Sequence, residues 1–141
     1  MNGAERYTSI TLRSTQDHLA RDVRQALTGP IKSLPCKYFY DPEGMALFEQ
    51  ICHLPEYYLT RVETAILKNQ AARIIELCPT ELVLVELGSG SSTKSRYLIE
   101  PCLARQEQLA YYAIDISPGG MENGVRQLLQ EYPRLRIVGL V

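Results

Sequence analysis

The chain has 141 residues, 45% of them apolar and 22% charged, which is enough for one domain with a buried core. Its 15 Lys and Arg residues against 16 Asp and Glu residues exclude the strongly basic surface of nucleic-acid binders and membrane-surface proteins. No stretch has the apolar length of a membrane span or the pattern of a secretory signal. We therefore expect a cytoplasmic protein that binds a small molecule or another protein, with no nucleic acid and no membrane as a partner.

The cysteines predict no metal site and no disulfide framework. The chain has four of them at wide spacings, with no C-x-x-C pair and only two histidines that could complete a zinc site: Cys36, Cys52, Cys78 and Cys102. Buried or free thiols in a reducing compartment are the expectation for such a pattern.

The first helical pattern in the chain lies within residues 14–78. Ser14 followed by Asp17 resembles a capping box, and apolar residues then recur every four positions until Gly29 and Pro30 end the helix. The pattern predicts one amphipathic helix near the N-terminus.

Two further helices complete a helical segment over residues 1–80. A short one is expected around residues 47–51, and Thr60 with Glu63 forms a second capping box that opens a longer helix ending before Pro79. The polar segment 54–60 lies between these two helices.

Residues 81–141 have a different hydrophobic pattern, in which short apolar runs alternate with amphipathic stretches. This alternation is typical of βαβ units and predicts an α/β fold with a parallel sheet. The expected strands are residues 82–87, 109–116 and 135–141, and the expected helices are residues 91–99 and 121–132.

A glycine-rich turn follows the first of these strands. Gly88 and Gly90 lack a Cβ, so the backbone can turn sharply and a ligand can approach it closely, while the helix that follows offers unpaired N–H groups. Ligands of open α/β sheets bind at the carboxyl ends of the strands, where this turn lies. A plain strand-to-helix turn would have the same two glycines.

Three charged residues favour a ligand site at this turn. Glu86 interrupts an apolar strand, where an unpaired carboxylate is costly unless it meets solvent or a cationic ligand. Asp115 ends the next strand, close to the spacing at which an acid binds ribose hydroxyls. Lys94 falls in the first turn of the expected helix, where the helix dipole disfavours a cation unless an anion is bound.

Three ligand classes compete for the turn. A dinucleotide fingerprint lacks its third glycine, because Thr93 stands there, and the same residue spoils an otherwise close match to a phosphate-binding loop that ends at Lys94. The acid-x-Gly-x-Gly pattern with the later Asp115 fits S-adenosylmethionine better, since this molecule carries a cationic sulfonium and a ribose but no phosphate.

Four segments of the chain resemble the histidine-specific, S-adenosylmethionine-dependent methyltransferases, in the order in which they occur there. They are residues 33–41 (SLPCKYFYD), 47–51 (LFEQI), 54–61 (LPEYYLTR) and 86–90 (ELGSG). Leu59 and Cys36 depart from the family, which usually has proline at both positions.

The resemblance implies S-adenosylmethionine as the cofactor and assigns residues to it. Gly88 corresponds to a position of close backbone approach, Lys94 to one that binds the methionine carboxylate, and Asp115 to one that binds the ribose. The remaining expected cofactor-binding residues belong to the same turn: Glu86, Ser89 and Gly90. Tyr57, the first tyrosine of the Pro-Glu-Tyr-Tyr segment, corresponds to a residue that contacts the substrate histidine. No residue is assigned a catalytic proton transfer, and no metal is required.

The resemblance also implies a fold and an activity. The fold is a Rossmann-like class I methyltransferase sheet whose first three strands have the order 3-2-1, and the activity is methylation of the α-amino group of L-histidine, as in ergothioneine biosynthesis. Because the family is considerably longer, we expect residues 1–80 to be an N-terminal helical segment with a substrate-side loop and residues 81–141 to be the first half of the cofactor-binding domain. The outer edge of strand 82–87 would then be uncovered, which favours self-association or pairing with a second chain. A cofactor-binding remnant without activity is the alternative.

Overall fold

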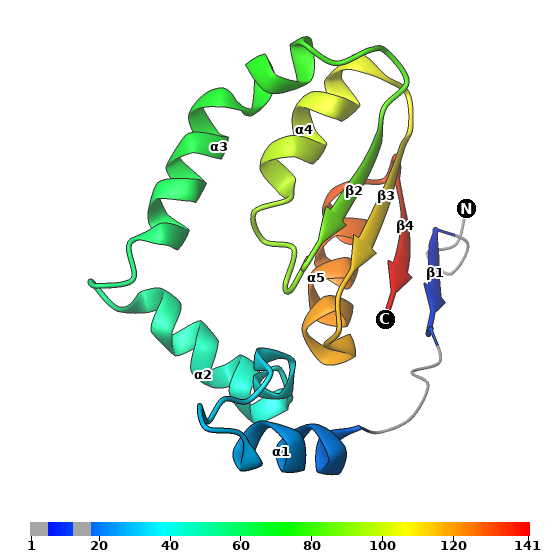
Figure 1. Cartoon of the computed structure of the whole chain (residues 1–141). Coiled ribbons are helices and arrows are strands. Elements are labelled where there is room, and N and C mark those ends of the chain that lie inside the picture. The colour runs from blue at the N-terminus through cyan, green and yellow to red at the C-terminus, as the bar shows by residue number, and fades with distance from the viewer. Residues whose placement is uncertain (1–5, 13–17) are drawn as a thin grey trace.

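The centre of the fold is a parallel sheet, as the alternation of strands and helices predicts. The computed structural model describes residues 6–12 and 18–141, and three of its strands are β2 (Val83–Leu87), β3 (Leu109–Ile114) and β4 (Leu135–Leu140). β2 pairs in parallel with β3, and β3 in parallel with β4 (Figure 1). The α/β class expected from the sequence is confirmed.

A fourth strand changes the sheet from the one expected. β1 (Tyr7–Ile10) pairs in parallel with β4, so the sheet has the order β1-β4-β3-β2 and includes a strand that the expected order 3-2-1 does not contain. Within residues 1–80, which we expected to be a helical segment with a loop, residues 7–10 thus form a strand. β1 is only four residues long and pairs with residues about 130 positions away, so no local pattern announces it.

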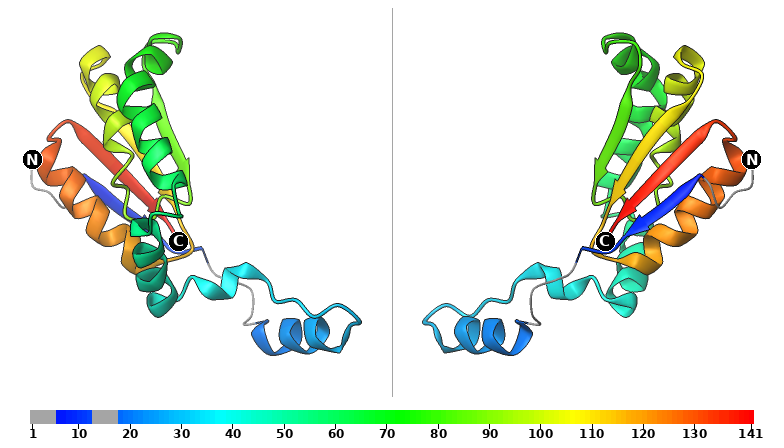
Figure 2. Two further views of the ribbon diagram at one scale, coloured as in Figure 1. Left: turned by 90° about the vertical axis from the view of Figure 1, so that its left-hand side faces the viewer. Right: turned by 90° about the vertical axis from the view of Figure 1, so that its right-hand side faces the viewer.

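Helices cover one face of the sheet. α4 (Arg96–Arg105) connects β2 to β3, α5 (Pro118–Glu131) connects β3 to β4, and α3 (Leu59–Glu76) packs against α4 (Figure 1). Together they bury a core that includes Ile99, Tyr111, Met121, Leu128 and Ile137. The views of Figure 2 show α3, α4 and α5 on the same side of the sheet.

The opposite face of the sheet and its β2 edge are apolar and open. Val83, Val85 and Leu87 alternate along β2 with 57%, 56% and 79% of their surface exposed. The helices α3, α4 and α5 lie on the other side of the sheet (Figure 2).

The remaining helices extend away from the sheet (Figure 2). They are α1 (Leu19–Thr28), the 3-10 helix η2 (Cys36–Phe39) and α2 (Pro42–His53), which contain no buried residue. α1 and η2 are tied together by Asp22, which accepts a hydrogen bond from the Tyr38 hydroxyl at 2.8 Å and pairs with Lys37 at 3.0 Å. The proposed capping box of Ser14 and Asp17 lies outside the described residues.

Three helices start at residues other than those expected. α3 begins at Leu59 after Tyr58, with no side-chain cap, so Thr60 and Glu63 lie inside the helix and form no capping box. α4 begins at Arg96 rather than at residue 91, because residues 91–95 continue the turn after β2. The helix assigned to residues 121–132 forms three residues earlier, as α5.

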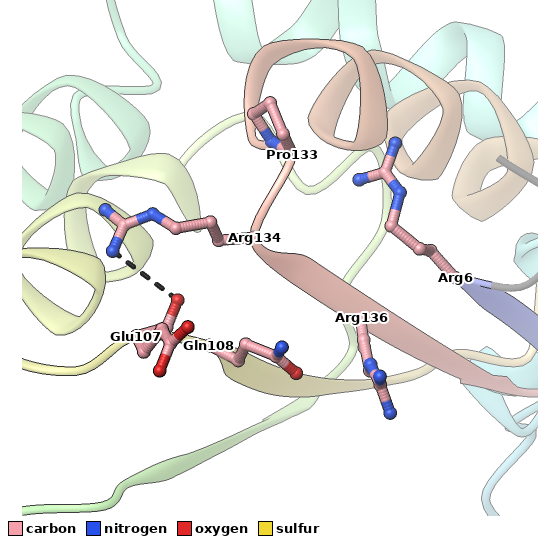
Figure 3. A pocket seen from close by; sticks show the side chains of 6 residues that line it. All are labelled: Arg6, Glu107, Gln108, Pro133, Arg134 and Arg136. Atoms are coloured by element: carbon pink, nitrogen blue, oxygen red, sulfur yellow. Dashed lines mark hydrogen bonds between the residues drawn. The ribbon is translucent and has the colours of Figure 1, made fainter. Parts of the chain in front are cut away.

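Three arginines close the C-terminal ends of the helices, each from a segment outside the helix it caps. The Arg105 guanidinium donates to the carbonyls of Ile75 and Cys78 at the end of α3. Arg134 donates to carbonyls at and just after the end of α4, including that of Glu107 (Figure 3). The third arginine, Arg6, caps the C-terminal end of α5.

Arg6 donates to the carbonyls of Leu129 at 2.8 Å and Tyr132 at 3.0 Å. Helix C-termini leave their last carbonyls without intrahelical partners and carry partial negative charge, so a guanidinium is well placed there. Together with Arg136, Arg6 and Arg134 surround the hollow of Figure 3, at the end of the sheet where β3 and β4 begin. No described helix has the length and apolar character to cross a membrane.

Candidate functional site

The turn after β2 adopts the backbone that its glycines permit. Gly88 and Gly90 have φ angles of 71° and 48°, a region that favours glycine, and Ser92 joins them with φ 53°. A Cβ built at Gly88 or at Gly90 would meet no other atom within 4 Å. The turn therefore presents open space along its backbone, which is what close approach of a ligand needs.

The amides of this turn are used inside the protein. Gly88 and Ser89 donate their backbone N–H groups to the Ile114 carbonyl at 2.8 and 3.1 Å, and Ser92 donates to the Ser89 carbonyl at 2.8 Å. A phosphate-binding loop needs such N–H groups free to surround its phosphates. The use of these three amides inside the protein therefore disfavours the phosphate-loop interpretation.

Asp115 lies beside the turn, at the carboxyl end of β3. Its Oδ2 accepts the Gly90 N–H at 2.7 Å and its Oδ1 accepts the Ser117 N–H at 2.8 Å. Sequence reasoning places Asp115 near the glycines, and the structure brings them into contact. Each carboxylate oxygen has a second lone pair, so Asp115 can hold the turn and still accept a hydroxyl from a ligand.

Glu86 lies on the face of β2 that the helices cover. Its Oε2 accepts two hydrogen bonds, from the Tyr111 hydroxyl and from the Ser95 hydroxyl, each at 2.5 Å. From the sequence we expected this carboxylate to be stabilised by solvent or by a cationic ligand. The structure supplies a third reason, because two hydroxyl donors stabilise the charge beneath the turn.

Tyr111 is the residue of this site that the sequence analysis missed. It is completely buried, and its oxygen also lies 3.1 Å from the Ser92 hydroxyl and 3.2 Å from the Ser95 hydroxyl. Burial, followed by the negative charge of Glu86, raises the pKa of Tyr111 well above its ordinary value of 10. The phenol therefore stays protonated and acts as a fixed donor that joins β2, β3 and the turn.

Ser89 is the polar side chain that this turn leaves unsatisfied. It is 6% exposed, and its hydroxyl has no hydrogen-bond partner among the described residues. A buried hydroxyl without a partner is costly, so a group that binds at the turn and hydrogen-bonds Ser89 would gain free energy.

Lys94 is placed differently from the expectation. It precedes α4 by two residues instead of lying in the helix, and its Nζ forms a hydrogen-bonded ion pair with the Glu63 carboxylate of α3. The argument from the helix dipole therefore fails for Lys94. The anion beside it is supplied by the protein itself.

Tyr57 lies apart from the glycine turn, in the connection between α2 and α3. Its ring packs edge-on against Phe48, with centroids 5.8 Å apart. Arg61 holds the connection by donating to the carbonyls of Leu54 at 2.9 Å and Pro55 at 2.5 Å. No described contact joins Tyr57 to the residues around Gly88.

An aromatic cavity adjoins Tyr57 through Phe48. It has a volume of about 510 Å³, and its lining comes from η2 and α2 and the residues between them, including Tyr38, Tyr40, Asp41 and Phe48. The motif SLPCKYFYD contributes four of the nine lining residues, a role that the linear motif does not reveal.

The family model described as histidine-specific methyltransferase, SAM-dependent, matches residues 19–141. A histidine N-alpha-methyltransferase of Mycolicibacterium smegmatis is 41% identical over 88% of this chain. An ergothioneine biosynthesis protein 1 of Neurospora crassa is 34% identical over 80% of the chain, which covers 13% of that protein.

A third relative carries a different substrate in its name. A 4-dimethylallyltryptophan N-methyltransferase of Epichloe festucae var. lolii is 31% identical over 93% of this chain, which covers 38% of that protein. This chain likewise spans 38% of the length of the Mycolicibacterium smegmatis relative.

Proposed function

This chain belongs to the histidine-specific, S-adenosylmethionine-dependent methyltransferase family, and on that premise we propose that it carries the cofactor-binding turn of an enzyme that methylates the α-amino group of L-histidine. The reaction class is the one named for the Mycolicibacterium smegmatis relative, and the Neurospora crassa relative supports a place in ergothioneine biosynthesis. The Epichloe festucae relative makes an indole amino acid the alternative substrate to test.

In this proposal the two parts of the chain have different tasks. Residues 81–141 form the first half of a Rossmann-like cofactor domain, whose strands β2, β3 and β4 follow one another across the sheet. The helical residues up to 80 carry the substrate side, with Tyr57 and the aromatic cavity that Phe48 shares with it.

The observation that carries the proposal is the turn itself. Its left-handed glycines face open space, and the neighbouring Ser89 hydroxyl is buried without a described partner. These two features fit a ligand that approaches the backbone closely and supplies one polar atom. S-adenosylmethionine has suitable groups in its ribose and in its amino-acid end, and it has no phosphate that would need the amides already used.

Each cofactor residue has a defined task here. Gly88 and Gly90 allow the approach, Asp115 accepts ribose hydroxyls while it holds the Gly90 amide, and Lys94 binds the methionine carboxylate. Glu86 acts from below through Ser95 and Tyr111, which fix the end of the turn.

The methyl transfer requires mainly that the protein align the two reactants. When bound, S-adenosylmethionine supplies a methyl group on a cationic sulfur, which a neutral amine nitrogen attacks with its lone pair while the carbon–sulfur bond breaks. Alignment of two reactants can contribute roughly 7 to 11 kcal/mol to such a step. Tyr57 orients the amine by a hydrogen bond, and we assign it no proton abstraction.

Turnover by these 141 residues alone should be very slow. Among the described residues only Tyr57 and the aromatic cavity next to it are available for the substrate, and no described contact joins them to the cofactor turn. Pairing of the open β2 edge with another chain, or with a second copy, is a way in which a fuller site could form.

Isothermal titration calorimetry tests the proposed function. We expect heat of binding with S-adenosylmethionine and with S-adenosylhomocysteine, and none with ATP and magnesium. Binding of ATP and magnesium alone would contradict the proposal and restore the phosphate-loop interpretation. Binding of S-adenosylmethionine without any methylation of histidine by a longer protein that contains this chain would favour a non-catalytic cofactor binder.

A further inference from the structure

The ion pair of Lys94 and Glu63 is the contact by which the glycine turn reaches α3. Lys94 belongs to the residues that follow Gly90, and Glu63 stands on the second turn of α3, six residues after Tyr57. The two side chains keep 35% and 55% of their surface exposed, so the pair is open to a ligand from solvent.

Stability is a weak reason for this pair. Exposed ion pairs contribute little, and α3 is held against α4 by other contacts. The Lys68 ammonium lies 5.5 Å from the centre of the Tyr97 ring, and Arg105 caps the far end of α3. Stability therefore does not explain why this ion pair lies at the glycine turn, and we consider a role in ligand binding.

We propose that Glu63 is a cofactor-specificity residue, which binds the α-ammonium of the methionine end of the cofactor while Lys94 binds its carboxylate. The inference rests on the proposed function and adds to it a residue on α3, outside the cofactor turn. The ion pair of Lys94 and Glu63 is the observation that carries it.

The reason is charge complementarity. An α-amino acid end carries a positive and a negative group side by side, and the ion pair presents a negative and a positive group side by side. When the ligand's charge pair lies antiparallel to the ion pair, positive and negative charges alternate around a square. Each charge then has an opposite charge on both sides, so all four neighbouring interactions are attractive. Because both protein side chains are half solvated, they can exchange part of their mutual contact for the ligand at small desolvation cost.

The arrangement also selects against other ligands. Lys94 alone would attract any anion, a nucleotide phosphate included, whereas Glu63 beside it repels ligands that carry only negative charge. A nucleoside with no amino-acid end would gain nothing from either residue.

Glu63→Gln tests the inference in this chain by titration with two probes. S-adenosylhomocysteine has the amino-acid end, and 5′-methylthioadenosine has the same nucleoside and sulfur without it. We expect the substitution to weaken binding of S-adenosylhomocysteine about tenfold and to leave binding of 5′-methylthioadenosine unchanged. Glu131→Gln is the matched control, because it removes an exposed acidic partner from Arg96 of the adjoining helix and should change neither affinity.

A third probe separates the two charges. For an S-adenosylhomocysteine analogue without its α-amino group, Glu63→Gln should strengthen binding, because it removes the repulsion between Glu63 and the lone carboxylate, while Lys94→Gln should still weaken binding. Equal weakening of all probes by Glu63→Gln would mean a purely structural role, and tighter binding of S-adenosylhomocysteine would mean that Glu63 competes with the ligand; either result overturns the inference. If the unaltered chain binds no adenosine ligand, the proposed function itself fails and the inference with it.

Discussion

The two ends of the sheet are built for different purposes. At the end where the strands begin, arginine side chains donate to helix carbonyls, and Arg6 and Arg134 border a hollow (Figure 3). At the end where β2 and β3 finish, the backbone at Gly88 and Gly90 is left-handed and faces open space, and the Ser89 hydroxyl has no described partner.

This difference separates stability from binding. Side chains that close helix ends contribute to the free energy of unfolding, whereas open backbone and unsatisfied hydroxyls gain only when a ligand arrives. Substitutions at the arginine end should therefore change stability alone. Substitutions beneath the glycine turn should change stability and affinity together.

The largest effect is expected for Gly124→Ala, at the point where α5 meets the glycine turn. A Cβ at Gly124 would lie 2.0 Å from the carbonyl oxygen of Ser91, so the turn or the helix must shift. We expect the free energy of unfolding in urea to fall by about 3 kcal/mol and S-adenosylhomocysteine to bind at least tenfold more weakly.

Gly119→Ala is the control on the same helix. A Cβ at Gly119 meets no atom within 4 Å, so alanine should leave stability unchanged or raise it by up to about 1 kcal/mol. Equal behaviour of the two variants would show that α5 does not constrain the turn.

Arg6→Ala should destabilise the protein without affecting the site. It leaves the carbonyls of Leu129 and Tyr132 without their charged donor, which costs about 2 kcal/mol of unfolding free energy. Arg136→Ala, from the same hollow, removes a side chain that has no hydrogen bond to the described residues and should stay within about 0.5 kcal/mol (Figure 3). A loss of cofactor affinity in Arg6→Ala would contradict the claim that the arginine end of the sheet affects stability but not binding.

Tyr111→Phe should affect both properties moderately. Loss of the hydroxyl removes one of the two donors to Glu86 and the link to Ser92, at a cost of about 1.5 kcal/mol, and the loosened turn should bind S-adenosylhomocysteine a few-fold more weakly. Tyr112→Phe is the control, because this neighbour makes no hydrogen bond through its hydroxyl among the described residues and should behave like the unaltered chain.

The pH dependence of stability at alkaline pH should report on the hydrogen bonds of Tyr111. Burial raises the pKa of Tyr111, and it also raises that of Tyr132, whose hydroxyl donates to Glu100 at 2.6 Å. A raised pKa in the folded state means that the unfolded chain loses these protons first, so stability should be level below pH 10 and fall above it. Urea midpoints from pH 8 to 11 should show a shallower decline for Tyr111→Phe, and an unchanged decline would contradict this role.

Much of the site could be predicted from local signals. Gly88, Gly90 and Asp115 are readable because strands that alternate with helices bring their carboxyl ends to one edge, where an acid and a glycine turn meet. Both helices of residues 81–141 were also expected from the sequence, although α4 spans Arg96–Arg105 instead of residues 91–99 and α5 begins three residues before the expected start.

The failures share a physical origin in contacts between distant segments. β1 exists through its pairing with β4, and Glu63 lies inside α3, where its carboxylate pairs with Lys94 and not with a helix terminus. Tyr111 resembles an ordinary core residue in the sequence. Only the register of β2 against β3 places its hydroxyl under the turn, within reach of Glu86.

The most direct test of the contrast is amide hydrogen exchange of this chain with and without saturating S-adenosylhomocysteine. The account predicts slower exchange in residues 88–95 and around Asp115, and no change at the hollow lined by Arg6, Arg134 and Arg136. Protection at that hollow, with none at the glycine turn, would contradict it.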